Sequence, residues 1–518
     1  MLVKTFASAV QGVDAQIITI EVNTGGSATV GSQFYHLVGL PDNAVKEGFQ
    51  RIEAALKNVG YKMLRVKTVI NLAPAYLRKE GSYYDLPIAI GYLAASGQIG
   101  AEKIGDYLMM GELSLDGTLR PIKGALPIAI QARKEKFKGI ILPKQNAREA
   151  AIVNDLEVYG IDNLKEATAF LNGEKKLEPK IVYTRDEFFE NQSENDVDFS
   201  DVKGQENIKR ALELAAAGGH NAILIGPPGA GKTMLARRLP TILPPLDLRE
   251  ALETTKIHSV AGILPPESSL VAQRPFRAPH HTISDVALVG GGSNPLPGEI
   301  SLAHNGVLFL DELPEFKRSV LEVLRQPMEQ RKVTISRARI TVDYPSSFML
   351  IASMNPCPCG YYNHPEKDCV CAPGIVKRYL DKISGPLLDR IDLHVEVTPV
   401  SFDELASFER PAINSKDIAQ RVQQAREIQM ERFKDKKSIF CNAQMPTNMV
   451  REICSINKAG QILIKKAMEK LQLSARAYDR ILKVARTAAD LAASPDIKIE
   501  HLAEAIHFRN LDRENWAS

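Results

Sequence analysis

Along the first 170 residues, short apolar runs alternate with stretches of helical periodicity. Three of the runs are typical of strands: Ile17 to Val22, Lys67 to Leu72 and Gly139 to Leu142. The clearest helix is predicted between Asp42, which suits its N-cap, and Gly60, which suits its end. Its apolar residues recur at helical spacing, at Val45, Phe49, Ile52 and Leu56. The alternation predicts a mixed α+β domain over residues 1–175.

An acidic stretch follows and predicts a linker at residues 176–201. Between Tyr183 and Asp201 stand seven acidic residues and one Arg, a composition typical of a solvated connection. Over residues 202–400 strands and helices alternate again, now with glycine-rich turns after strands, which predicts a parallel sheet with ligand sites at the strand ends. Residues 401–518 are predicted to form a helical lid, in which one apolar face comprises Ile418, Val422, Ala425 and Ile428.

Composition changes this picture little. A length of 518 residues suggests about three domains at roughly 150 residues each. The 65 basic and 62 acidic residues leave a formal charge of +3, so composition neither demands nor excludes a DNA partner. No apolar run is long enough to span a bilayer and the start lacks a secretory pattern, so we expect a cytoplasmic protein without a membrane partner.

The strongest chemical signal is a phosphate-loop motif. The apolar strand Ala222 to Ile225 precedes it, and a helical pattern follows it. The loop comprises Gly226, Pro227, Pro228, Gly229, Ala230, Gly231, Lys232 and Thr233. In such a loop the backbone amides and the Lys bind the phosphates, and the Thr hydroxyl ligates Mg²⁺. The sequence therefore predicts a site for ATP and Mg²⁺.

Two further strand ends complete a predicted hydrolysis site. The strand Val307 to Leu310 ends in Asp311, which suits the Mg²⁺ sphere, and Glu312, which suits the base that orients the attacking water. The strand Phe348 to Ala352 leads to Asn355, which is placed either to hold that water or to form a turn before Pro356. Arg390 is a candidate arginine finger, with a surface ion pair to Asp389 or Asp392 as the alternative.

Six cysteines are too few for a disulfide framework, yet four of them fall within fifteen residues. These four are Cys357, Cys359, Cys369 and Cys371. Four thiolates on one loop suit tetrahedral Zn²⁺, although Cys-x-Cys is tighter than the usual spacing. A reduced cysteine-rich loop without metal is the alternative.

Several strings resemble the magnesium-chelatase-like AAA+ ATPases, and within them the ComM/YifB branch. They are the phosphate loop, Arg277 to Ser284, Gly290 to Ser293, Pro297 to Gly306, Leu310 to Leu313, Asn355 to Gly360 and Gly385 to Asp392. The resemblance implies a homo-hexameric ring with ATP between subunits, and a helicase that drives DNA branch migration in natural transformation. It assigns Asn355 as first sensor, Arg390 as the finger acting on a neighbour, and Arg476, in preference to Arg480, as second sensor.

Residues 333–342 alternate around a basic turn and predict a hairpin with Arg337 and Arg339 near its tip. This hairpin resembles the channel hairpin of ring helicases, which implies DNA contact. A second loop, Arg274 to Gly292, carries Arg277, His280 and His281 and is predicted as another channel element.

The first domain resembles the proteolytic domain of Lon, through Gly111 to Gly117, Leu119 to Ile122 and Gly139 to Lys144. Tyr83 stands at the position of the nucleophilic Ser and Leu126 at that of the Lys base, while Ser82 is one residue out of register. A nucleophile without its base is inert, so we expect no peptidase activity. Two other functions remain open alternatives, the motor subunit of a metal-chelatase complex and a chaperone-like unfoldase.

Overall fold

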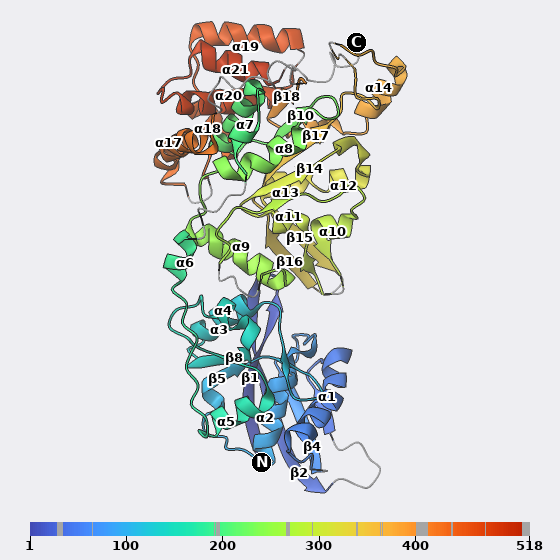
Figure 1. The fold of residues 1–518 in the computed structure, drawn as a ribbon, viewed down its shortest axis with the longest axis vertical. Helices are drawn as coiled ribbons and strands as arrows, with labels where there is room; N and C mark the ends of the chain where they lie inside the picture. Colours follow the sequence, from blue (N-terminus) through green and yellow to red (C-terminus); the bar gives the residue numbers. More distant parts are fainter. Residues whose placement is uncertain are drawn as a thin grey trace.

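The computed structural model describes residues 1–27, 35–64, 66–190, 192, 197–265, 270–292, 294–337, 340–362, 364, 366–399, 413–436, 439–471 and 473–509. The molecule is elongated, with the N-terminal part at one end, a central sheet in the middle and the C-terminal helices at the other end (Figure 1). It is a mixed α/β protein, as the sequence predicts.

The N-terminal part is built on a seven-stranded sheet in the order β3-β4-β2-β1-β5-β8-β9. Its strands are β1 (Leu2–Gln11), β2 (Asp14–Ser27), β3 (Tyr35–Val38), β4 (Val66–Ala73), β5 (Tyr107–Met109), β8 (Gly139–Pro143) and β9 (Glu157–Ile161), with a separate pair β6 (Glu112–Leu113) and β7 (Leu119–Arg120). Its helices are α1 (Asn43–Val59), α2 (Asp85–Ala95), α3 (Ala125–Lys134), α4 (Ala147–Ala150) and α5 (Leu164–Leu171). The three predicted strand runs fall within β2, β4 and β8.

Helix α1 forms as its sequence predicts. The Asp42 side chain accepts a hydrogen bond from the Val45 amide at 2.9 Å, and Gly60 ends the helix with φ of 98°. Glycine adopts this left-handed conformation without the steric cost that other residues meet. The four predicted apolar residues of the helix are all buried.

The central sheet has the order β11-β14-β17-β10-β18, and every pairing in it is parallel. Its strands are β11 (Phe276–Arg277), β14 (Val307–Leu310), β17 (Met349–Met354), β10 (Ala222–Ile225) and β18 (Leu393–Glu396). Successive residues of β10 and β14 face two hydrophobic clusters, one on each side of the sheet. A strand buried on both faces reads as a continuous apolar run, which explains the sequence pattern.

Helices cover this sheet, and small elements extend from it. The helices are α7 (Glu206–Gly218), α8 (Lys232–Arg238), α9 (Leu248–Ala261), α10 (Asp285–Val289), α11 (Glu299–Leu302), α12 (Arg318–Glu322), α13 (Arg325–Gln330), α14 (Pro373–Leu380) and α15 (Gly385–Leu388). Two short antiparallel pairs complete this part, β12 (Gly290–Gly291) with β13 (Leu296–Pro297), and β15 (Lys332–Arg337) with β16 (Ile340–Pro345).

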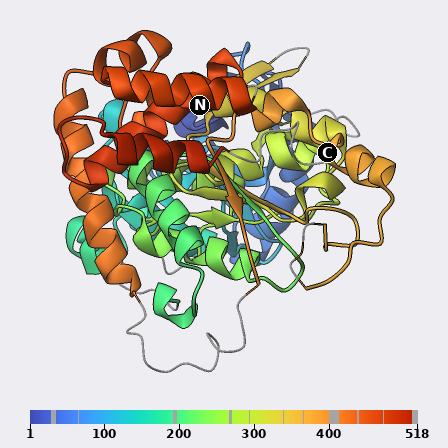
Figure 2. The same ribbon diagram turned by 90° about the horizontal axis from the view of Figure 1, so that it is seen from above.

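The C-terminal part is helical and packs on α7, and the Phe508 carbonyl accepts a hydrogen bond from the His394 amide of β18 at 2.7 Å. Figure 2 shows its helices, in orange and red, from above. It comprises α17 (Ser415–Phe433), α18 (Thr447–Ile453), α19 (Lys458–Leu471), α20 (Ala475–Leu491) and α21 (Ile499–His507). One predicted core residue is wrong: Ile428 is 38 % exposed. Gln429 is buried instead, and its amide donates to the Ala217 carbonyl at 3.0 Å, so a polar residue takes the inner position one place further along α17.

The acidic stretch before the central sheet is more structured than its composition suggests. It contains α6 (Thr184–Glu190), in which Phe188 is buried in the N-terminal hydrophobic cluster. Helix α9 joins the two parts more directly (Figure 1). The Gly124 amide donates to the Ser259 carbonyl at 3.0 Å, and the Ser259 hydroxyl donates to the buried Glu149 carboxylate.

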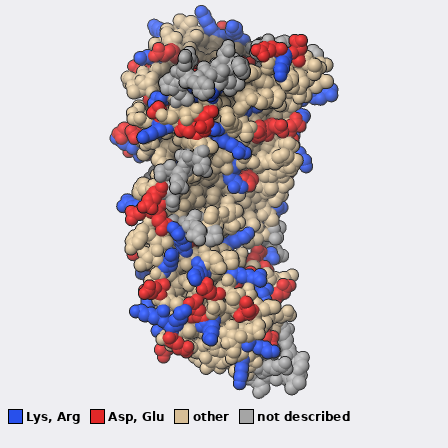
Figure 3. Space-filling view, in the orientation of Figure 1, with Lys and Arg blue, Asp and Glu red and all other residues tan. Residues whose placement is uncertain are grey.

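On the face drawn in Figure 3, basic and acidic side chains are interspersed along the whole length of the molecule, in keeping with the small net charge. Within the described ranges, no helix combines the length and apolar character required to cross a membrane.

Candidate nucleotide-binding site

The phosphate loop lies between the end of β10 and the start of α8. Gly231 has φ of 82° and directly precedes the helix, so the loop turns sharply into the first helical residue, Lys232. The Lys232 ammonium donates to the carbonyls of Gly226 at 2.7 Å and Pro227 at 2.8 Å. Burial lowers the pKa of this amine, while the carboxylates of Asp311 and Glu312 act in the opposite direction. The cation is thus held over its own loop, at a helix N-terminus that attracts anions.

The predicted residues at the other strand ends meet this loop. The Thr233 hydroxyl donates to the Asp311 carboxylate at 2.7 Å, and the Lys232 ammonium donates to the Asn355 amide oxygen at 3.1 Å. The other Asp311 oxygen accepts from Ser353 of β17. Since β10, β14 and β17 are parallel, their carboxyl ends lie side by side, which brings these side chains together.

Glu312 stands apart from this network and faces solvent. Its backbone is left-handed, with φ of 53°, and its side chain is 57 % exposed. The carboxylate lies 3.4 Å from Nδ1 of His281, whose ring contacts His280 and Phe316. His281 therefore lies beside the predicted catalytic carboxylate, a position that the sequence did not indicate.

A pocket of about 530 Å³ adjoins the phosphate loop. Its walls come from the segment before α7, the loop with the start of α8, the cysteine-rich loop and the end of β18. The lining residues are Asp201, Val202, Lys203, Gln205, Pro227 to Gly231, Met234, Leu235, Tyr361, His364, Lys367 and Pro399. The sequence predicted only the phosphate-loop members of this set, because the others carry no recognisable spacing.

Arg390 lies just before the amino end of β18, at the opposite end of the parallel strands from the phosphate loop. Its guanidinium is 10 % exposed, contacts the Glu329 carboxylate and donates to the Pro386 carbonyl. Its ion-pair partner is therefore neither Asp389 nor Asp392, the two considered from the sequence. Its Nε is buried and has no hydrogen-bond partner among the described groups.

Neither candidate second sensor lines the pocket. Arg480 of α20 forms an ion pair with the buried Asp392 carboxylate and donates to the Arg390 carbonyl at 3.3 Å. Arg476, one turn earlier on α20, is exposed and is not among the pocket residues. Arg480 is thus placed beside Arg390, before the amino end of β18.

The four predicted cysteines form one cluster between β17 and α14. Their sulfur atoms all lie within 4.8 Å of one another, and Cys357 is buried. The sulfur of Cys359 lies 3.2 Å from that of Cys357 and 3.5 Å from that of Cys369. A set of four thiols this close fits one tetrahedral metal ion of the zinc type.

The predicted hairpin is present as β15 and β16, with Val333, Ile335 and Val342 buried and Arg337 exposed in its last described pair. Arg339 lies outside the described residues. A Cβ added at Gly291 would lie 3.3 Å from Nη2 of Arg337, so the hairpin end meets the glycine turn of the second predicted loop.

Two arginines of that second loop are engaged within the fold. Arg274 donates to the Asn305 carbonyl at 2.7 Å and to Glu250 at 2.9 Å, and Arg277 donates to Glu299 at 2.7 Å. Of the basic residues predicted for a channel, His280 and Arg337 are the exposed ones that the structure describes.

The Lon-like positions lie in the N-terminal part. Leu126 is fully buried, and burial raises the pKa of the Tyr83 hydroxyl. The Ser82 hydroxyl donates to the Glu112 carboxylate, which also pairs with Arg120 at 3.6 Å.

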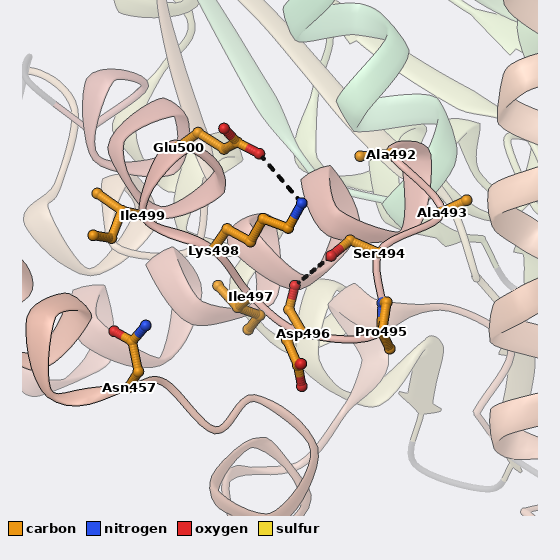
Figure 4. Close-up of a pocket in the computed structure, with 10 residues that line it drawn as sticks. All are labelled: Asn457, Ala492, Ala493, Ser494, Pro495, Asp496, Ile497, Lys498, Ile499 and Glu500. Carbon is orange, nitrogen blue, oxygen red and sulfur yellow. Dashed lines mark hydrogen bonds and ion pairs between the residues drawn. The ribbon is translucent and has the colours of Figure 1, made fainter.

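A second hollow of about 650 Å³ lies in the C-terminal part (Figure 4). It is formed by the α20–α21 connection and Asn457. In it the Ser494 hydroxyl donates to the Asp496 carbonyl at 2.8 Å and Lys498 lies 3.9 Å from Glu500. None of the residues predicted for a site lines it.

The all-parallel sheet, the loop after β10 and the Asp-Glu pair after β14 define a P-loop fold of the AAA+ type. A family profile described as magnesium chelatase, subunit ChlI, matches residues 198–405, and profiles for subunit ChlI of Mg-chelatase and for the ChlI C-terminal region match residues 20–146 and 412–509.

Among individual proteins, the chain is 43 % identical to competence protein ComM of Haemophilus influenzae, over 98 % of this chain and 97 % of that protein. It is 44 % identical to the YifB protein of Escherichia coli, over 98 % and 96 %. Lon protease 2 of Bacillus subtilis matches 27 % of this chain and 26 % of its own length, at 30 % identity. The chain belongs to the magnesium-chelatase-like AAA+ family, in the branch of ComM and YifB, and this membership indicates an ATPase that uses ATP and Mg²⁺.

Proposed function

We propose that this protein is an ATP-driven ring motor that remodels DNA, with a ComM-like role in branch migration during recombination or natural transformation. The observation that carries the proposal is the joint presence of the strand-end cluster around Lys232 and of an exposed hairpin arginine, in a chain similar to a competence protein along nearly its whole length. We assign residues 1–175 to a Lon-like domain without peptidase activity, 176–201 to the connection, 202–400 to the motor and 401–518 to the lid.

In the motor, the Lys232 ammonium gives up its hydrogen bonds to the loop carbonyls and binds the β- and γ-phosphates instead. Thr233 and Asp311 offer hard oxygen ligands, hydrogen-bonded at 2.7 Å, and this donor set suits Mg²⁺. When bound, Mg²⁺ neutralises charge on the phosphates. Glu312 orients the attacking water and accepts its proton, and Asn355 holds the water or the γ-phosphate from the other side.

Arg390 completes the site of a neighbouring subunit as an arginine finger, and Arg476 acts as the second sensor. Arg390 precedes the amino end of β18, at the opposite end of the strands from the phosphate loop, so it does not reach the nucleotide of its own chain. Arg480 fixes this region, because it bonds both Asp392 and the Arg390 carbonyl. In a ring of identical subunits, such as the homo-hexamer that we propose, this end of the sheet faces the phosphate loop of the next chain.

The β15–β16 hairpin contacts the DNA backbone through Arg337. Besides meeting the glycine turn at Gly291, the hairpin touches the N-terminal part, because a Cβ at Gly12 would lie 2.7 Å from Cγ1 of Val342. Val13 packs against the same hydrophobic cluster as Val333 and Ile335. The N-terminal domain therefore supports the hairpin, as a platform that guides DNA would.

We also assign one structural Zn²⁺ to the cysteine cluster, because its four sulfur atoms lie within 4.8 Å of one another.

ATPase activity measured with and without single-stranded and branched DNA tests the proposal. Arg337→Ala should keep basal turnover and ring assembly, but lose DNA stimulation and show a shallower salt dependence, because fewer counterions are released. Lys332→Ala is the matched control: Lys332 is on the same strand at the hairpin base, paired with Asp343 at 3.0 Å. ATPase activity indifferent to every DNA would overturn the proposal and favour a chelatase motor or an unfoldase.

A further inference from the structure

We infer that the cysteine-rich loop between β17 and α14 forms one wall of the nucleotide pocket, that Tyr361 stacks on the base, and that metal bound by the four thiols sets nucleotide affinity. The inference rests on the proposed ATP and Zn²⁺ sites, and goes beyond them by linking the two.

The pocket adjoins the residues that suit phosphate and Mg²⁺ but has a different lining. This lining includes Pro227 to Gly231 of the phosphate loop, and not Lys232, Thr233 or Asp311. There the walls include four apolar side chains: Val202, Met234, Leu235 and Pro399. The base is the flat and mostly apolar part of a nucleotide, so these apolar side chains suit the base.

Tyr361 is the aromatic residue in this lining. Its ring is half-buried and makes an edge contact with His364 at 5.6 Å between centroids. The Lys367 ammonium lies 5.0 Å from the centroid of the Tyr361 ring. Bases stack well on such rings, and each stack contributes about 1–3 kcal/mol. Lys367 thus covers one face of the Tyr361 ring, and a purine would stack on the opposite face.

The thiol cluster fixes this face. Tyr361 follows Cys359 by two positions, so a metal ligand and the stacking residue belong to one short turn of the chain. The Gly360 amide donates to the Cys357 carbonyl at 3.0 Å. A Cβ at Gly360 would lie 2.5 Å from Cδ of Pro228, so the loop lies directly against the phosphate loop. A change in the cluster therefore moves the wall.

Metal is expected to hold this arrangement. Four thiolates bound to one ion stay within bonding distance, whereas without the ion the cysteines are mostly neutral thiols at pH 7 and no bond holds the four sulfur atoms together. Loss of the ion should release the segment from Cys357 to Cys371, and Tyr361 would then no longer be held against the pocket.

Calorimetric titration with ADP tests the stacking role, because ADP lacks the γ-phosphate on which turnover depends. Tyr361→Ala should weaken ADP binding about tenfold, while Tyr361→Phe retains it. Tyr362→Ala is the matched control, since Tyr362 is the adjacent residue, equally half-buried, and does not line the pocket. Equal ADP affinity of the Tyr361→Ala and Tyr362→Ala variants would overturn the stacking role.

The metal link is tested in the wild-type chain, which avoids any folding defect of a variant. Protein stripped by a chelator and desalted should bind ADP about tenfold more weakly than the same sample reloaded with Zn²⁺, and Cys369→Ser should behave as the stripped protein does. Unchanged ADP affinity on metal removal would overturn the link. These readouts need no DNA, so they stand if the motor proves to act on another substrate, and absence of ADP binding would instead refute the ATP site itself.

Discussion

Lys232 and Asn355, 123 positions apart in the chain, are joined by a hydrogen bond of 3.1 Å from the ammonium group to the amide oxygen. The bond exists because β10 and β17 are parallel neighbours, so their carboxyl ends lie next to each other. A γ-phosphate bound by Lys232 would replace this contact, so Asn355 is positioned to respond to the nucleotide. Binding and hydrolysis thus depend on different residues of one cluster, which mutation can separate.

The first prediction separates them. Lys232→Ala should abolish nucleotide binding, since the loop loses its cation, whereas Glu312→Gln should bind ATP and fail to hydrolyse it, because only the carboxylate that orients the water is removed. Titration with ATP and phosphate release, measured on both variants, distinguish the two defects. Wild-type turnover by Glu312→Gln would remove Glu312 from the mechanism and direct attention to its neighbour His281.

A second prediction concerns the buried carboxylate of Asp392, which directly precedes β18. Burial by itself would raise the pKa of Asp392, but Arg480 and then His220 act against it and hold the pKa well below its ordinary value. A depressed pKa means that the ionised group stabilises the fold above its unfolded pKa and loses this effect as the pH falls below it. At neutral pH the stabilisation is complete.

Asp392→Asn should therefore lower the free energy of unfolding by about 3 kcal/mol, because Arg480 and His220 lose a charged partner inside the protein. Denaturant unfolding at neutral pH measures this change. Asp389→Asn is the matched control, since Asp389 is three positions earlier and only half-buried. An unfolding midpoint shared by the two variants would mean that the Asp392 pair contributes no stability.

Much of this architecture is readable from the sequence where chemistry and secondary structure coincide. The phosphate loop, the Asp-Glu pair and Asn355 each follow an apolar strand, and strands of a parallel sheet end together, so their meeting could be predicted. The caps of α1 were predictable for a similar reason, because Asp42 and Gly60 act on the backbone of their own helix.

Contacts decided by distant packing could not be predicted. Nothing near Arg390 in the chain indicates Glu329 as its partner, and nothing near Glu312 indicates His281. The position of Tyr361 in the pocket depends on how the cysteine-rich loop folds back on Pro228. In α17, periodicity alone favoured Ile428, whereas the bonds that Gln429 makes to the Ala217 carbonyl and the Asn442 amide turn that residue inward.

The last prediction asks whether active sites are shared between chains. Arg390→Ala should spare ATP binding but reduce turnover by roughly 10³-fold or more, since trans arginine fingers contribute about 10³–10⁵ to the rate. Arg390 precedes the amino end of β18, whereas Lys232 follows the carboxyl end of β10, so the two residues belong to different interfaces of a ring. When the Arg390→Ala chain is mixed with the Lys232→Ala chain, some interfaces combine an intact loop with an intact finger, and activity should partly recover. Mixing Lys232→Ala with Glu312→Gln provides the control, because both changes damage the same half of the site and no arrangement of chains restores it. No recovery in the first mixture, once co-assembly is shown by size and mass, would mean that each chain hydrolyses ATP without its neighbour and that Arg390 acts within its own fold through Glu329.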